Sequence, residues 1–278
     1  MAIMLKRLPI FVFALAGALM CLSPAAEAQS LDITSAGDGG PIEILADDGI
    51  EWHQEEKVFV ARGNARAIRE TVTVDSDVLR AYYRETDGGT EIWRMDANGS
   101  VEIRSPTETI YGDEAIYDVI NGVLVVKGED IRFVAGDDLI TAEQQLEYWE
   151  TKQMAVARGD AMIKRPDRTV YGDVLAAHFS RDASGTTSVN RVDAYDNVKI
   201  VTISDTATSD RGVYNVVTGV ATLTGNVNIM RGKNTLSGCK AVVDLNTGIS
   251  KLFACENGTD TRVQGTFQKE SETTEDPE

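Results

Sequence analysis

The chain has 278 residues, of which 42% are hydrophobic and only 6% are aromatic, and its formal net charge at pH 7 is −17. A protein this acidic repels nucleic acids and anionic membrane surfaces at long range, so the composition argues against a nucleic-acid partner. The length is compatible with one domain or two.

The first 28 residues are predicted to be a secretory signal peptide. Lys6 and Arg7 form a positive start, residues 8–22 are apolar, and Ala26-Glu27-Ala28 is a small-x-small cleavage site. Removal of two positive charges and one negative charge changes the net charge from −17 to −18. The alternatives are an uncleaved membrane anchor, for which the apolar run is short, and a lipoprotein signal at Cys21.

A short phrase recurs about every thirty residues: a glycine or aspartate, a polar residue, and then a strand of alternating apolar residues. The gaps between successive copies are 36, 29, 31, 37 and 29 residues. A nearly fixed period of this size predicts a repeat architecture built by stacking. The copies begin at Gly63, Gly99, Gly128, Gly159, Asp196 and Gly225.

The alternation within each copy predicts strands. Val101 and Ile103 fall on one face, while Ser100 and Glu102 fall on the other, as in a sheet with one buried face. The best helix candidate, residues 141–153, matches the strand phrase of its neighbours. The predicted fold class is therefore all-β, with about six two-strand repeats. Their sheet folds over on itself and leaves an apolar seam between two walls.

The seam is either a filled core or a lipid-sized groove, and composition leaves both readings open. If it is a groove, the inward-facing positions line it, and a ligand held there would not touch Glu102 or Asn228. The predicted lining residues are Val101, Ile103, Ile131, Phe133, Ile163, Val198, Ile200, Val227 and Ile229.

Two cysteines, Cys239 and Cys255, follow the predicted signal peptide. The turn signal at residues 244–248 predicts a hairpin centred on Thr247, which sets these cysteines opposite each other. An exported pair so placed is predicted to form a disulfide. The alternative is two free thiols, if the hairpin register differs by one residue.

A longer pattern joins the two phrases of each repeat: apolar-x-Ala/Gly-Asp-x-Ala-x-Tyr-Asp, a turn, and then Gly-Asn-Val. It is clearest in residues 208–229, 110–133 and 236–252. The pattern resembles the OstA/LptA family, the periplasmic lipopolysaccharide-transport bridge protein and its relatives, over roughly 42–265. The resemblance implies a twisted open β-jelly roll whose inner apolar face carries acyl chains, each buried CH₂ contributing about 0.8 kcal/mol.

The resemblance also implies the location and the partners. It implies a periplasmic protein that binds lipopolysaccharide. Edge-strand pairing would join it to an inner-membrane transport complex and an outer-membrane translocon, with head-to-tail self-association as a further option. It implies no cofactor. The chain departs from the family pattern in its greater length and in its cysteine pair.

The expected organisation is a signal peptide at 1–28, a disordered segment at 29–41, one jelly roll at 42–265 and a disordered acidic tail at 266–278. No interior segment has the Pro/Ser-rich composition of a linker.

An enzyme and a metal site are not expected. His53 and His178 are far apart, and no Gly-x-Ser-x-Gly motif occurs. Asp113 and Asp173 follow glycines at matching repeat positions, which indicates turn residues rather than acid–base catalysts. The pair at 137–138 lacks the ligand spacing of a calcium loop.

Three alternatives to a lipid-transfer scaffold remain open. The first is a secreted β-repeat interaction protein or adhesin with a filled core. The second is a glycan-processing β-solenoid enzyme, which requires carboxylates clustered on one strip. The third is the membrane-anchored partner of the same transport pathway, which depends on whether residues 1–28 are cleaved.

Overall fold

The computed structural model describes residues 42–87, 89–181, 187–247, 249–255 and 262–268. The predicted signal peptide, the segment 29–41 and nearly all of the tail lie outside these residues. Eighteen strands form one antiparallel sheet, and no helix occurs in the described residues. The all-β prediction is confirmed. Within the same residues, no helix is long and apolar enough to cross a membrane.

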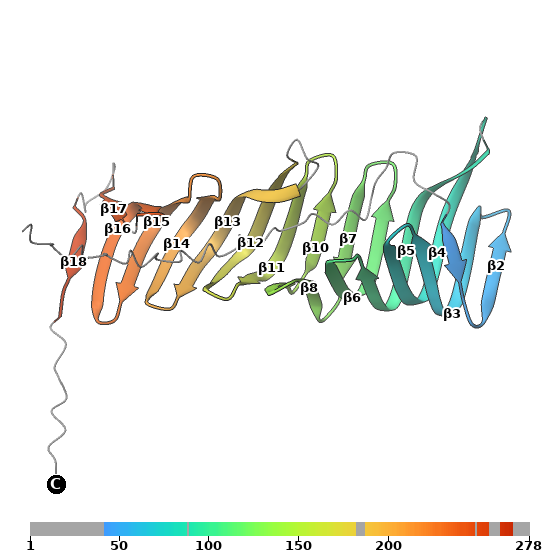
Figure 1. Cartoon of the computed structure of the whole chain (residues 1–278), viewed down its shortest axis with the longest axis horizontal. Helices are drawn as coiled ribbons and strands as arrows, with labels where there is room; N and C mark the ends of the chain where they lie inside the picture. Colours follow the sequence, from blue (N-terminus) through green and yellow to red (C-terminus); the bar gives the residue numbers. More distant parts are fainter. Residues whose placement is uncertain (1–41, 88, 182–186, 248, 256–261, 269–278) are drawn as a thin grey trace, which may run out of the picture.

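The sheet is a long ribbon that follows chain order from β2 at one end to β18 at the other (Figure 1). The strands are β1 (Glu43–Leu45), β2 (Gly49–His53), β3 (Val58–Arg69), β4 (Val72–Thr86), β5 (Gly89–Arg104), β6 (Glu108–Asp118), β7 (Val123–Lys127), β8 (Ile131–Ala135), β9 (Asp138–Ala142), β10 (Gln145–Trp149), β11 (Met154–Lys164), β12 (Arg168–Arg181), β13 (Thr187–Thr202), β14 (Asp205–Asn215), β15 (Val220–Arg231), β16 (Asn234–Asp244), β17 (Ile249–Phe253) and β18 (Gln264–Thr266).

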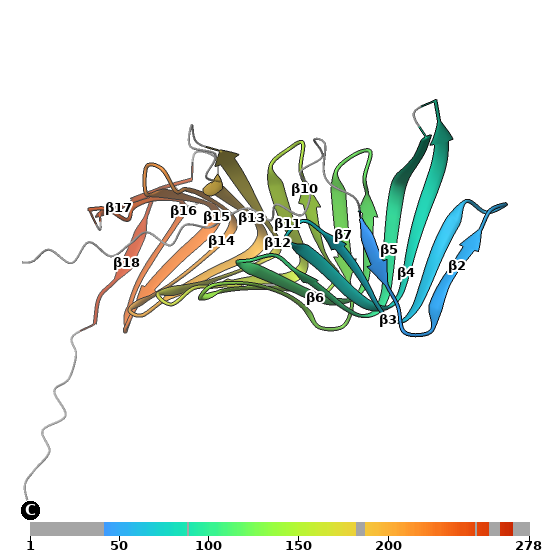
Figure 2. The ribbon, with the colours of Figure 1, turned by 45° about the vertical axis from the view of Figure 1, so that its right-hand side comes forward.

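Most strands bend in the middle and contribute to two walls. The first half of β3 pairs with β2 and its second half with β1. In the same way β6 pairs with β7 through one half and with β8 through the other. We call the wall that contains β2, β7, β10 and β17 the upper wall, and the wall that contains β1, β8, β9 and β18 the lower wall. A rung is one bent strand, or two short strands that together cross both walls. Figure 2 shows the strands passing from one layer into the other.

The recurrent phrase of the sequence marks the bends. Gly63 and Asn64 both have positive φ, 76° and 43°, and the β3–β4 register shifts beside them. Gly225 and Asn226 repeat this with 76° and 45°, beside a register shift between β15 and β16. Glycine adopts this conformation without strain, and asparagine and aspartate tolerate it better than other residues. The phrase is therefore a bulge that folds a strand into a V.

An aspartate on the neighbouring strand holds several of these bends. Asn226 Nδ2 donates to Asp210 Oδ1 and Oδ2 at 3.1 and 2.9 Å, and Asn197 Nδ2 donates to both oxygens of Asp173 at 3.0 Å. Asp113 in β6 accepts from the backbone of Glu129 at 2.8 Å. The prediction that Asp113 and Asp173 are turn residues is wrong, because a bend inside a strand uses the same residue types as a chain reversal.

We expect Gly225→Ala to lower the free energy of unfolding by about 2–3 kcal/mol. The left-handed backbone costs an alanine about 1–2 kcal/mol, and the loss of the hydrogen bonds at the bend adds about 1 kcal/mol. The added Cβ would collide with the Asp210 carboxylate. Urea denaturation measures the loss. The control is Gly232→Ala, where φ is +57° and no atom lies within 4 Å of the added Cβ. An equal loss in both variants would show that the contact with Asp210 contributes nothing.

Candidate functional site

All nine predicted lining residues lie on the lower wall, in the halves of the strands that follow the bends. Five have exposed fractions of only 1–2%: Val101, Ile103, Ile131, Val198 and Val227. Four are half-buried and pack against the core clusters: Phe133, Ile163, Ile200 and Ile229. The predicted alternation of faces agrees with Glu102, which forms a 3.1 Å ion pair with Arg104. No ligand contact of these residues is tested by the structure.

The sequence analysis missed the facing row of the upper wall. This row consists of the inward-facing side chains of the strand halves that form the upper wall, and these side chains are also buried. Part of the signal lay in the Ala-x-Tyr-Asp pattern, because Ala115 and Leu146 stand two positions before Tyr117 and Tyr148. The row includes Leu79, Ala97, Ala115, Val126, Leu146 and Leu175, which are 1–9% exposed.

The two rows close the seam over much of the ribbon. One cluster of buried side chains extends from Ala61 to Val198, and a smaller one is formed by Leu223, Val227 and Ala241. The seam opens within β3 to β7, where a cavity of about 440 Å³ lies between the walls. A volume of this size is typical of sites for small organic ligands.

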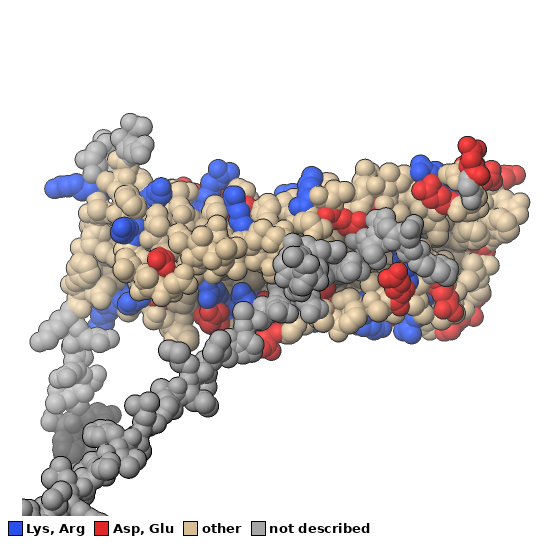
Figure 3. Space-filling view, turned by 45° about the horizontal axis from the view of Figure 1, so that its top comes forward, with Lys and Arg blue, Asp and Glu red and all other residues tan. Residues whose placement is uncertain are grey.

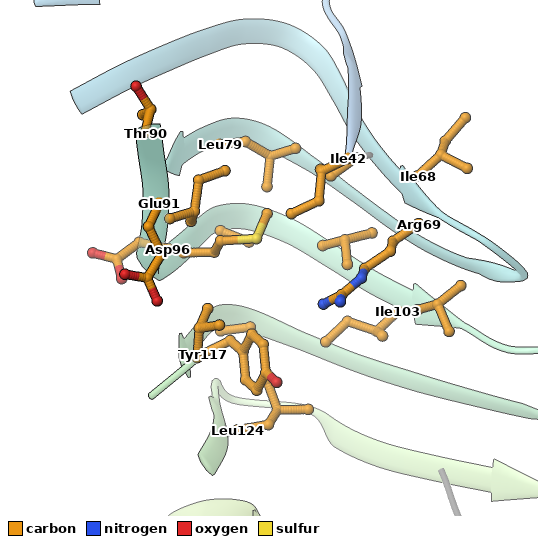
Figure 4. Close-up of a pocket in the computed structure, with 18 residues that line it drawn as sticks. Ile42, Ile68, Arg69, Leu79, Thr90, Glu91, Asp96, Ile103, Tyr117 and Leu124 are labelled. Carbon is orange, nitrogen blue, oxygen red and sulfur yellow. The ribbon is translucent and has the colours of Figure 1, made fainter. Parts of the chain in front are cut away.

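The cavity is apolar along its walls. Leu79, Met95 and Leu124 line it from the upper wall, and Val74 and Ile103 line it from the lower wall. Figure 4 shows these strands around the cavity, with Leu79, Ile103 and Leu124 labelled. This apolar part of the lining favours hydrocarbon over charged groups, whereas Arg69, Glu91 and Asp96 also line the cavity.

Polar side chains mark one region of the same cavity. The guanidinium of Arg69 points into it (Figure 4). Tyr117 Oη donates to Glu150 Oε1 at 3.2 Å. Burial, followed by the Glu150 carboxylate, raises the pKa of Tyr117, while the charge of Arg69 acts in the opposite direction. The phenol therefore stays protonated at neutral pH, and the cavity combines apolar walls with a charged and hydrogen-bonding region.

Cys239 and Cys255 form a disulfide with Cα atoms 5.0 Å apart. The predicted hairpin register is wrong by one residue, because Phe253 at the end of β17 faces Lys240 and not Ala241. Both cysteines lie just beyond this last ladder pair, where the hydrogen bonds of the ladder no longer fix which residues face each other. The bond therefore does not require the predicted pairing, and it ties the end of β17 to the bend in β16.

The described residues contain no group of three or more His, Cys, Asp or Glu that could hold a metal ion. His178 Nε2 lies 2.9 Å from Asp193 Oδ2, and His53 Nε2 lies 2.7 Å from Glu51 Oε2. The two histidines are on β12 and β2, so the structure does not bring them together.

Part of the chain matches a known protein family. Residues 139–249 match the family model described as LptA/(LptD N-terminal domain) LPS transport protein. This segment belongs to the OstA/LptA-like family. The resemblance predicted from the repeats is thereby confirmed, and the family consists of transport proteins.

Two individual proteins are similar to this chain. The "Uncharacterized protein R00383" of Rhizobium meliloti (strain 1021) is 24% identical over 135 residues, which are 47% of this chain and 70% of that protein. The crystal structure of LptH, the LptA-homologous periplasmic component of the lipopolysaccharide transport device of Pseudomonas aeruginosa, matches with 17% identity and a TM-score of 0.41. That match covers 48% of this chain and 95% of LptH.

Proposed function

We propose that the protein is a periplasmic lipopolysaccharide-binding transport protein that shields acyl chains between its two walls. The observation that carries this proposal is the 440 Å³ cavity with mostly apolar walls that opens in the seam within β3 to β7. Burial of acyl chains offers about 0.8 kcal/mol per CH₂. The interaction needs no opposite charge, so a net charge of −17 does not oppose it.

The free edges of the ribbon support a bridging role. The edge rung β1/β2 exposes 59% of Trp52 and 50% of Ile50, and the edge strand β17 exposes 57% of Ile249 and 45% of Phe253. Strands with one open edge and exposed apolar side chains are suited to strand addition by another sheet. We propose that these edges join jelly rolls of an inner-membrane transport complex and an outer-membrane translocon, or further copies of the chain.

Photo-crosslinking to lipopolysaccharide tests the binding proposal. A photoreactive residue at Met95 or Ile103, which line the cavity, is expected to capture the lipid. The same residue at Glu102, on the opposite face of β5 from Ile103, is expected to remain free. Capture at Glu102 alone would show that the faces are assigned in reverse, and no capture at any position would refute lipid binding in the seam.

A secreted interaction protein with a filled core is the second candidate. It is favoured by the tight packing in the middle of the ribbon, where Val126, Ile131 and Ala161 are 0–1% exposed. This function predicts that lipopolysaccharide is not captured at Met95 or Ile103, so the same experiment separates the two candidates.

A further inference from the structure

The first half of the described chain recurs in the second half at a spacing of 96 residues. Residues 42–83 align without gaps with 138–179, and 15 of these 42 positions are identical. The six residues 60–65 read VARGNA, and residues 156–161 read VARGDA. The spacing then becomes 97, and 12 of the 35 positions in 94–128 are identical to those in 191–225. This period spans three of the thirty-residue repeats.

The backbone repeats at the same spacing. In both halves the first rung is broken into two short strands, β1/β2 and β9/β10. Two backbone hydrogen bonds connect the residues between these short strands to the next strand. Lys57 and its equivalent Gln153 both have positive φ, 54° and 48°. The equivalent bonds at the break are Asp47 N to Gly63 O (2.8 Å) with Glu143 N to Gly159 O (2.7 Å), and Asp48 N to Arg62 O with Gln144 N to Arg158 O (both 3.0 Å).

Ion pairs recur as well. In each half, an arginine pairs with the aspartate two positions later on the same strand, just before a bend. A second ion pair joins a glutamate of the second short strand, β2 or β10, to the arginine that precedes the bend of the next strand. The equivalent pairs are Arg94–Asp96 with Arg191–Asp193, and Glu51–Arg62 with Glu147–Arg158. Shared side-chain pairs at one spacing are not required by a generic thirty-residue stack, so they indicate a duplicated larger unit.

The start of the second unit lies against the end of the first. Strand β10 pairs with β7 on the upper wall, and β9 pairs with β8 on the lower wall. At this joint Leu146 and Tyr148 are 9% and 6% exposed. Their equivalents at the free edge, Ile50 and Trp52, are 50% and 59% exposed. The joint therefore buries the side chains that the same rung exposes when nothing covers it.

We infer that the described chain is a tandem of two duplicated jelly-roll units, residues 42–137 and 138–233, and that the rung β7/β8 is the surface on which the second unit docks. The family match begins at residue 139, inside the first strand of the second unit. The part from β16 onward is an extension, since β16 occupies on β15 the place that β9/β10 occupies on β7/β8. The core cluster contains residues of both units, so the seam continues through the joint.

The two units have diverged in surface charge. The first has 21 acidic and 10 basic residues, whereas the second has 12 acidic and 11 basic residues. In Figure 3 the acidic side chains gather toward the end of the first unit, while basic side chains are more frequent toward the other end. The number of basic residues is nearly the same in the two units, so the difference comes from the acidic residues.

Cleavage at the joint tests the tandem. A protease site is inserted between Gly136 and Asp137, in the β8–β9 turn, of the full chain, and the control site is inserted between Pro166 and Asp167, in the β11–β12 turn. After cleavage at the joint we expect the parts to elute together, to separate in urea, and to refold singly with one cooperative transition each. Mixing the refolded parts is expected to restore the original elution volume.

Cleavage at the control site is expected to yield parts that do not refold singly, because it leaves the first rungs of the second unit on the wrong fragment. A matched variant, Leu146→Asp in the chain cleaved at the joint, is expected to weaken reassociation at least tenfold while each part keeps its own transition. Equal behaviour of the two cleaved chains would overturn the inference in favour of one uninterrupted stack. No lipid is used, so the outcome is independent of lipid binding.

Discussion

Replacement of Ala97 by phenylalanine is expected to abolish binding of a lipid acyl chain while the fold is retained. Ala97 lies on β5 and lines the cavity, so the added ring projects into space that the proposed ligand would fill. Each displaced CH₂ group forfeits about 0.8 kcal/mol, and 1.4 kcal/mol is about a tenfold change in affinity. Displacement of two or more CH₂ groups therefore weakens binding more than tenfold. Titration of a fluorescent acyl-chain probe measures this loss.

The matched control is Ala194→Phe. Ala194 is the equivalent position in the second unit, is 5% exposed, and belongs to the filled part of the core. Overpacking there is expected to cost about 1–3 kcal/mol of stability and to leave probe binding in the first unit unchanged. If Ala97→Phe instead destabilises the protein as much as Ala194→Phe and leaves binding intact, the cavity is not the lipid site.

Replacement of Glu147 by alanine is expected to lower the free energy of unfolding by about 2–3 kcal/mol. The carboxylate is 6% exposed and accepts bonds from Arg158 Nε at 2.5 Å, Gln145 Nε2 at 2.6 Å and Trp149 Nε1 at 2.8 Å. Its removal takes the charged acceptor away from three partly exposed donors, and a hydrogen bond to a charged group contributes about 1.5–3 kcal/mol. The equivalent Glu51 lies on the free edge and is 51% exposed, so Glu51→Ala is expected to change stability much less.

The loss depends on pH. Burial by itself would raise the pKa of Glu147, but the hydrogen bonds from Arg158, Trp149 and Gln145 outweigh it and hold the pKa below its usual value. A lowered pKa in the folded state means that the stabilisation is complete above the unfolded pKa of about 4.3. It disappears as the pH falls through the folded pKa. Urea denaturation at pH 7 and at pH 3 is expected to show a smaller difference between wild type and variant at pH 3. A difference independent of pH would show that the ionised carboxylate is not the stabilising group.

The alternation within single strands is local, and it predicted the buried face correctly. Val101 and Val198 are buried because successive side chains in a strand point to opposite faces, whatever the strand pairs with. The Gly-Asn phrase also recurs, and its backbone takes positive φ at Gly63 and Asn64. It did not predict whether the chain reverses or only bends, because Gly63 and Asn64 can adopt this conformation in both settings.

The duplication could have been found from the sequence. The match between residues 60–65 and 156–161 is plain, but the thirty-residue period is more frequent and conceals the longer one. Comparison at spacings up to half the chain length would have separated them. The hairpin register near Cys239 could not be found in this way, because it depends on the conformation of the connecting turn, which a repeat spacing does not specify.

The sequence by itself determined the strands, their apolar face and the family resemblance, since each depends on a local pattern of side-chain types. Only the tertiary structure decided where the seam is filled and where it opens. Packing depends on side chains that meet across two walls, such as Ala97 and Ile103 around the cavity, and no local pattern specifies that distance. It also decided that Tyr148 is covered while Trp52 is exposed, because burial depends on whether another rung lies alongside.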